Sequence, residues 1–129
     1  MRRKTDADGK VLTRKTERAA LITWAVLVLV LSVSDFAGSS PNVGFTIPDT
    51  VMHAVFYMPL AALFAANLSS PKSWKRWLYA ALLAFGFGVF MELVQWALPW
   101  RSFEIKDMAA NLFGAVVGSS FGLIVFSRE

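Results

Sequence analysis

The chain has 129 residues, a length that suits one domain, and 56% of them are apolar, with a mean hydropathy of +0.51. Only 17% of the residues are charged. This small amount of polar surface cannot cover an apolar core of this size in water. The composition therefore excludes an ordinary soluble domain and predicts that lipid surrounds the fold. Because the chain has no cysteine, disulfides, thiolate catalysis and cysteine-ligated zinc are excluded as well.

The net charge of +4 and the pI near 9.8 raise the question of a nucleic-acid partner. The basic residues flank apolar stretches and are not interleaved with aromatic residues, which is the pattern of a membrane topology signal. We therefore predict no nucleic-acid partner.

The first 18 residues carry seven of the 13 basic residues and are expected to form a disordered, cytoplasmic tail. Residues 19–34 follow without a charge and are rich in Leu and Val, which predicts a first transmembrane helix. A cleaved signal peptide is the alternative, with Ser32-Val33-Ser34 as the cleavage site. The long basic region before residue 19 and the apolar segments that follow favour an uncleaved helix.

Three further apolar segments complete the chain. Residues 35–48 hold Gly and Pro breakers and are expected to form a loop. Residues 69–76 are a short basic connector. The predicted helices, of the length that a hydrocarbon core of about 30 Å requires, lie at about 19–34, 49–68, 77–98 and 108–127. The sequence thus predicts an all-α integral membrane bundle of four transmembrane helices, formed by residues 19–129.

The orientation follows from the distribution of Lys and Arg. The tail, the 69–76 connector and the C-terminus together hold eleven of them, whereas the two other loops hold two, Arg101 and Lys106. The positive-inside rule therefore places both termini in the cytoplasm and residues 35–48 and 99–106 outside. For a bacterial protein, this means a multi-pass protein of the cytoplasmic membrane.

Polar residues then converge at one depth, in the outer half of the bundle. They have helical spacing on their segments, so each group shares one face. The set comprises Asp49, His53 and Tyr57, then Glu92 and Gln95, then Asp107 and Asn111, with Arg101 in the loop between the last two helices. Ionisable groups at membrane depth are costly and mark function by default. We predict that these residues bind a ligand, although a purely structural network that ties the helices together is the alternative.

The residue order resembles the VanZ-like family. The resemblance is carried by Pro48-Asp49-x-x-x-His53-x-x-x-Tyr57, Glu92-x-x-Gln95, Arg101, and Asp107-x-x-x-Asn111-x-x-Gly114-x-x-x-Gly118. One departure is Ala54, where the family often has Phe. The resemblance implies a small bacterial membrane protein, in a family whose founding member is associated with resistance to the glycopeptide teicoplanin. It supplies no reaction, because the biochemical mechanism of the family is not established.

Two classes of function remain open, besides a structural or regulatory subunit. The first is a binding module for an envelope lipid, a lipid-linked cell-wall precursor or the glycopeptide itself, with Arg101 as the anion anchor. The second is an intramembrane enzyme in which His53 and Glu92 are the candidate acid–base pair. No cofactor is predicted. A metal bound by His53, Glu92 and Asp107 is conceivable, but one His without a second nitrogen ligand is weak evidence for it.

Overall fold

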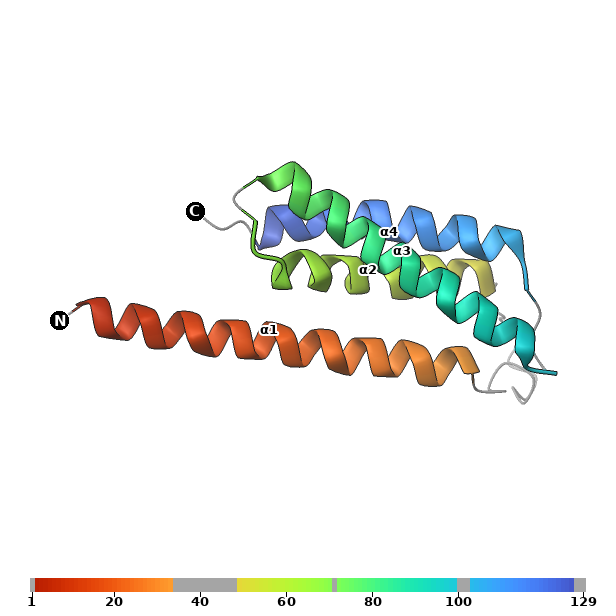
Figure 1. Cartoon of the computed structure of the whole chain (residues 1–129), viewed down its shortest axis with the longest axis horizontal. Coiled ribbons are helices and arrows are strands. Elements are labelled where there is room, and N and C mark those ends of the chain that lie inside the picture. The colour runs from red at the N-terminus through yellow and green to blue at the C-terminus, as the bar shows by residue number, and fades with distance from the viewer. Residues whose placement is uncertain (1, 34–48, 71, 100–102, 127–129) are drawn as a thin grey trace, which may run out of the picture.

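The computed structural model describes residues 2–33, 49–70, 72–99 and 103–126, without the side chains of residues 2–13 and of Asp49. It confirms the bundle of four helices (Figure 1). All four are long and apolar enough to cross a membrane. The helices are α1 (Arg2–Val33), α2 (Asp49–Asn67), α3 (Ser73–Ala97) and α4 (Ile105–Val125).

The first helix is longer than the sequence predicts. The expectation of a disordered tail over residues 1–18 is wrong where the chain is described, because α1 begins at Arg2 and runs without a break to Val33. Residues 2–18 contain Arg, Lys, Ala and Glu and no Pro, so they suit a helix. Extending a helix that already exists also avoids the cost of nucleation.

The third and fourth helices also begin earlier than predicted. Helix α3 begins at Ser73 instead of residue 77, and α4 begins at Ile105 instead of residue 108. Polar side chains are tolerated in these first turns because the turns lie at the ends of the membrane-spanning segments. The basic connector is therefore shorter than residues 69–76, and Arg76 becomes part of a helix.

A ridge of glycines on α4 lies against α2. A Cβ atom on Gly114 would lie 2.7 Å from the Ala54 carbonyl oxygen, and one on Gly122 would lie 2.8 Å from Ala62 Cα. A Cβ atom on Gly118 would overlap the Met58 carbonyl group. The two backbones therefore approach as closely as small residues allow, and this ridge packs helices within one chain.

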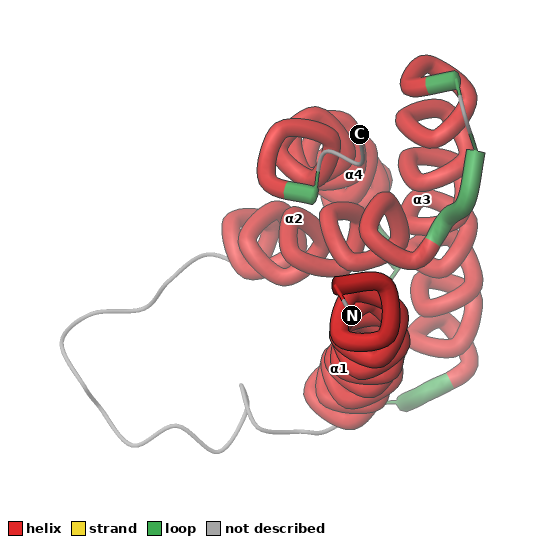
Figure 2. Tube along the Cα trace, turned by 90° about the vertical axis from the view of Figure 1, so that its left-hand side faces the viewer, coloured by secondary structure: helices red, strands yellow, loops and turns green. Residues whose placement is uncertain are grey.

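The rest of the bundle is organised around α2, which contacts all three other helices. Ala61, Ala84 and Ala115, one each from α2, α3 and α4, form a fully buried cluster. Helix α1 packs on α2 through Val28 and through Trp24, whose Nε1 donates to the Phe56 carbonyl at 2.9 Å. An end-on view shows α1 beside the group formed by the other three helices (Figure 2).

Both ends of the described chain lie at the same end of the bundle (Figure 1). Four membrane crossings require this arrangement. The ends of α1 and α3 and the starts of α2 and α4 therefore lie at the opposite end, which we call the far end. At a rise of about 1.5 Å per residue, His53, Glu92 and Asp107 all lie within about 10 Å of it.

Candidate functional site

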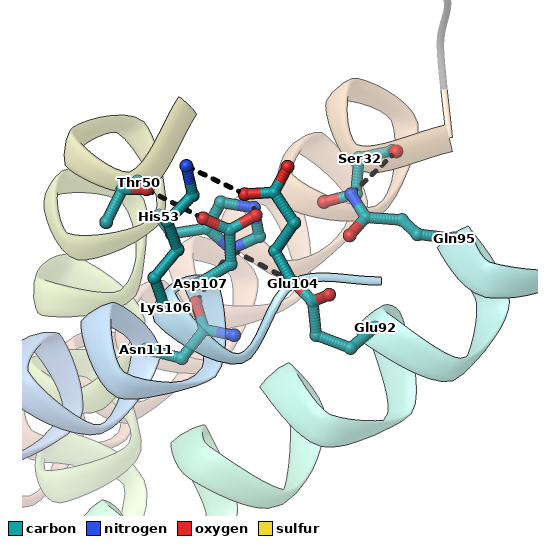
Figure 3. Close-up of polar contacts among 9 residues, drawn as sticks. All are labelled: Ser32, Thr50, His53, Glu92, Gln95, Glu104, Lys106, Asp107 and Asn111. Carbon is teal, nitrogen blue, oxygen red and sulfur yellow. Dashed lines mark hydrogen bonds and ion pairs between the residues drawn. The ribbon is translucent and has the colours of Figure 1, made fainter. Parts of the chain in front are cut away.

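Three ionisable side chains from three helices meet at the far end of the bundle. His53 of α2, Glu92 of α3 and Asp107 of α4 are all buried, and Glu92 is 0% exposed. Each offers one potential ligand atom, and these three atoms lie within 4.8 Å of one another. We call these residues together with Asn111 the polar cluster; Figure 3 shows their side chains directed toward one another.

Both nitrogens of the His53 ring face polar groups of neighbouring helices. Nδ1 lies 2.8 Å from Asn111 Oδ1, and because an amide oxygen only accepts, Nδ1 donates this hydrogen bond. The proton of the neutral ring therefore resides on Nδ1, and the lone pair is on Nε2. Nε2 faces Asp107 Oδ2 at 3.8 Å, while Nδ1 lies 3.6 Å from Glu92 Oε1. The imidazole thus lies between two carboxylates.

Asp107 is oriented by a residue of α2. Thr50 Oγ1 donates to Asp107 Oδ1 at 2.9 Å, which turns the other oxygen, Oδ2, toward His53 (Figure 3). Thr50 lies three residues before His53, so both face α4 from one side of α2.

A close approach of α3 and α4 brings Glu92 to the cluster. A Cβ atom on Gly88 would lie 2.8 Å from Asn111 Nδ2, so only glycine fits at this position without movement of the amide. Gly88 lies one turn before Glu92 on the same face of α3. The glycine therefore sets the distance at which Glu92 reaches His53.

Two buried donors lie at the polar cluster without an acceptor in the described part of the chain. They are the Tyr57 hydroxyl group and Asn111 Nδ2, and both side chains are at most 1% exposed. The Tyr57 ring is stacked on the His53 ring, with 6.1 Å between centroids and 3° between planes. A buried donor without an acceptor costs about 1–3 kcal/mol, so both groups are available to donate to an oxygen atom of a further molecule.

Gln95 contributes differently from the sequence prediction. It is buried one turn from Glu92, but its Nε2 donates to the Ser32 carbonyl of α1 at 3.0 Å and ties α1 to α3. The prediction that all of the polar residues form one cluster is thus met by His53, Glu92, Asp107 and Asn111, with Tyr57 stacked on His53. The side chain of Asp49 and the whole of Arg101 lie outside the described residues.

A crevice between α1 and α2 reaches the polar cluster from the side of the bundle. Its volume is about 50 Å³. The lining is mainly apolar and consists of Val28, Leu31, Ser32, Met52, His53, Phe56 and Tyr57. The crevice therefore lies between two membrane-spanning helices and borders the rings of His53 and Tyr57.

Sequence reasoning did not single out Thr50 or Arg76. A signal existed for both, because Thr50 shares the His53 face at spacing i−3, and Arg76 lies at spacing i−4 from Ala80 on the small-residue face of α3 that leads to Glu92. Arg76 is buried at the end of the bundle opposite to the polar cluster. It was interpreted only as a topology signal.

The polar cluster has an acidic character. Two carboxylates face one imidazole. Such a site can bind a cation, or move a proton between His53 and a bound molecule.

Comparison with known proteins places the chain in a family. The family model described as VanZ/LLP1 matches residues 7–126. An uncharacterised protein of the fission yeast Schizosaccharomyces pombe is 25% identical over 107 residues, which cover 81% of this chain and 65% of that protein. No solved structure matches. This chain of four membrane-spanning helices belongs to the VanZ-like family.

Proposed function

We propose that this chain binds the polar head group of a membrane lipid, or of a lipid-linked envelope molecule, at the polar cluster. The observation that carries the proposal is the mainly apolar crevice between the membrane-spanning helices α1 and α2, which is lined by His53 and Tyr57. A hydrocarbon chain would lie against Val28, Met52 and Phe56, and the head group would lie at the cluster. Apolar walls and a few convergent polar groups are typical of ligand sites.

The unmatched donors support a ligand that bears acceptor oxygens. Tyr57 and Asn111 each present a buried donor at the cluster, and a phosphate, ester or hydroxyl oxygen would accept from them. The volume of about 50 Å³ favours one hydrocarbon segment over a bulky glycopeptide. Among the ligands that the sequence allowed, an envelope lipid or a lipid-linked precursor is therefore favoured.

The physiological setting is part of the same proposal. With both termini in the cytoplasm, the polar cluster lies in the outer half of a bacterial cytoplasmic membrane, where envelope precursors are displayed. Binding of such a molecule would connect this chain with envelope homeostasis and with the antibiotic resistance associated with the founding member of the family.

The test is to fill the crevice without altering the polar cluster. Met52→Trp places a large ring in the crevice, whereas Val55→Trp places the same ring on the 54% exposed, lipid-facing side of α2. Each protein is purified in native lipid and washed in mild detergent, and the retained lipid per chain is measured by mass spectrometry. We expect lipid in the wild type and in Val55→Trp, and its loss in Met52→Trp. Equal retention in all three proteins, or none in the wild type, contradicts the proposal.

A second candidate function is acid–base catalysis on the bound molecule. The observation that favours it is the position of His53, which lies 3.6 Å from Glu92 and 3.8 Å from Asp107. An imidazole flanked by carboxylates can accept a proton and stabilise the imidazolium that forms. Mass spectrometry of the retained lipid, with His53→Gln added to the set of proteins, distinguishes catalysis from binding alone. An enzyme yields chemically altered lipid in the wild type and unaltered lipid in His53→Gln. A protein that only binds lipid yields unaltered lipid in both.

A further inference from the structure

We infer that His53, Glu92 and Asp107 form a binding site for a divalent transition-metal ion. One nitrogen and two carboxylate groups converge from three helices, with their ligand atoms within 4.8 Å of one another. An ion bound at about 2.0–2.2 Å in a tetrahedral site needs ligand atoms about 3.3–3.6 Å apart, so the three side chains must move closer together to bind it, and the long Glu92 side chain has the freedom to do so. The inference goes beyond lipid binding and does not depend on it.

The arrangement of hydrogen bonds around the three ligands supports this inference. His53 donates through Nδ1 to Asn111 Oδ1, which directs the Nε2 lone pair toward Asp107. Metal-bound histidines commonly donate their other nitrogen to a carbonyl or carboxylate oxygen in this way. Asp107 Oδ1 accepts from Thr50, which leaves Oδ2 on the side of the ring. The facing atoms, Nε2 and Oδ2, are 3.8 Å apart, too far for a hydrogen bond but suited to an ion between them.

The electrostatic balance also favours a cation. Glu92 and Asp107 are 0% and 2% exposed, and two carboxylates at such short range repel each other in a medium of low dielectric constant. A divalent ion bound by both carboxylates would lower this repulsion.

A second, independent observation concerns the remaining positions around such an ion. Three protein ligands leave coordination positions for water or for a ligand oxygen. The Tyr57 hydroxyl group and Asn111 Nδ2 are buried at this point and donate to no acceptor in the described chain. Oxygen atoms bound to the ion would accept from them.

The donor set indicates which metal binds. Mg²⁺ and Ca²⁺ prefer oxygen ligands throughout, whereas an imidazole with two carboxylates suits Zn²⁺ or Mn²⁺. We therefore expect Zn²⁺ or Mn²⁺ to bind more tightly than Mg²⁺ or Ca²⁺.

The experiment uses the full chain with an affinity tag that contains no histidine. The protein is stripped with EDTA and desalted, and thermal unfolding is followed by tryptophan fluorescence with each metal. We expect Zn²⁺ or Mn²⁺ to raise the midpoint by several degrees and to remain bound at about one ion per chain by elemental analysis. Mg²⁺ and Ca²⁺ at the same concentration should leave the midpoint unchanged. A wild type that retains no ion and responds to none of the four metals overturns the inference without the use of any variant.

Isosteric variants locate the ion. Glu92→Gln and Asp107→Asn keep the shape of the side chain and remove a buried charge, so without metal we expect them to fold at least as well as the wild type. Each should bind the ion at least about tenfold more weakly and lose the metal-dependent shift. Glu104→Gln is the matched control, because Glu104 lies near the far end but pairs with Lys106 on the surface at 3.0 Å. Metal binding that survives in Glu92→Gln, or that is lost in Glu104→Gln, contradicts this site.

The proposals of a metal site and of a lipid site can be contradicted independently of each other. Met52→Trp should lose lipid and keep the ion. A wild type that retains lipid but shows no metal response refutes the ion and leaves the lipid site standing.

Discussion

Arg76 is a buried arginine at the end of the bundle that holds both ends of the described chain. It lies in the first turn of α3 and is 4% exposed. Its Nε donates to the Ala65 carbonyl of α2 at 3.2 Å, and one terminal nitrogen donates to the Phe126 carbonyl after α4 at 3.1 Å. The last carbonyls of a helix lack partners within the helix and carry partial negative charge. One guanidinium thus caps two helices and joins them to a third.

Removal of this guanidinium should weaken the bundle. We expect Arg76→Met, which keeps an apolar stem of similar length, to lower the free energy of unfolding by about 1–3 kcal/mol, because two helix-end carbonyls lose a charged donor. Lys72→Ala, at an exposed position one turn earlier, should change it by less than about 0.5 kcal/mol. Thermal unfolding in detergent measures both. Equal effects of the two substitutions would contradict a capping role for Arg76.

The predictability of single residues differed with the kind of interaction. His53, Glu92, Asp107 and Asn111 could be predicted to lie at one depth, because the helical rise fixes depth once the spans are assigned. Gln95 could not be assigned to Ser32 of α1, because its partner is a backbone carbonyl and every residue carries one. Such a partner leaves no mark in the sequence.

Helix pairing depends on where small residues lie. Gly118 of α4 faces the Met58 carbonyl of α2, whereas Gly86 of α3 has no neighbouring atom within 4 Å of an added Cβ. Both glycines lie inside an apolar helix, but Gly118 belongs to a run of glycines at spacing i+4 and Gly86 does not. Only Gly118 is required by a close approach of two backbones.

This difference gives a matched pair of substitutions. We expect Gly118→Ala to destabilise the bundle by about 1–3 kcal/mol, because the added methyl group separates α2 from α4. Gly86→Ala should be neutral or slightly stabilising, because alanine is the better helix former and the methyl group meets open space. Chemical or thermal unfolding of the two variants measures the difference. A Gly118→Ala protein as stable as Gly86→Ala would show that the ridge does not set the helix separation.

The sequence located all four helices and placed the starts of α3 and α4 to within about a turn, but it missed the first 17 residues of α1. Apolar segments bounded by charges identify a membrane span, whereas the span says little about how far the helix continues into water. Helix α1 continues back to Arg2, and α3 begins at Ser73. The exposed Trp74 and Trp96 lie near the two ends of α3, and tryptophan is enriched at the two interfaces between membrane and water.

At the scale of the whole molecule, the orientation in the membrane remains a prediction. Both ends of the described chain lie at one end of the bundle, and the excess of basic residues assigns that end to the cytoplasm. Reporter fusions after Ser40 and after Lys72 test the assignment. We expect an active periplasmic reporter after Ser40 and an active cytoplasmic reporter after Lys72. Accessibility of both from the same side would contradict the four-span topology, and the reversed pattern would place the polar cluster in the inner half.

By itself, the sequence determined the number of spans, the family resemblance and the common depth of the polar residues. These depend on quantities that are local along the chain: the length of an apolar segment, the helical rise and the order of residues in a motif. The expected disorder was wrong for residues 2–18, because their composition suits a helix and they extend one that already exists, which avoids the cost of nucleation.

Only the tertiary structure decided how each helix is rotated about its axis. The polar residues indicate an inward face at one end of α2, α3 and α4, but the rest of each helix is mainly apolar, so its sequence leaves the exact rotation open. The rotation is set by close contacts between helices, such as Gly118 against Met58 and Gly88 against Asn111. Those contacts place the Nε2 atom of His53 opposite Asp107, turn Gln95 toward α1 and turn Arg76 into the bundle.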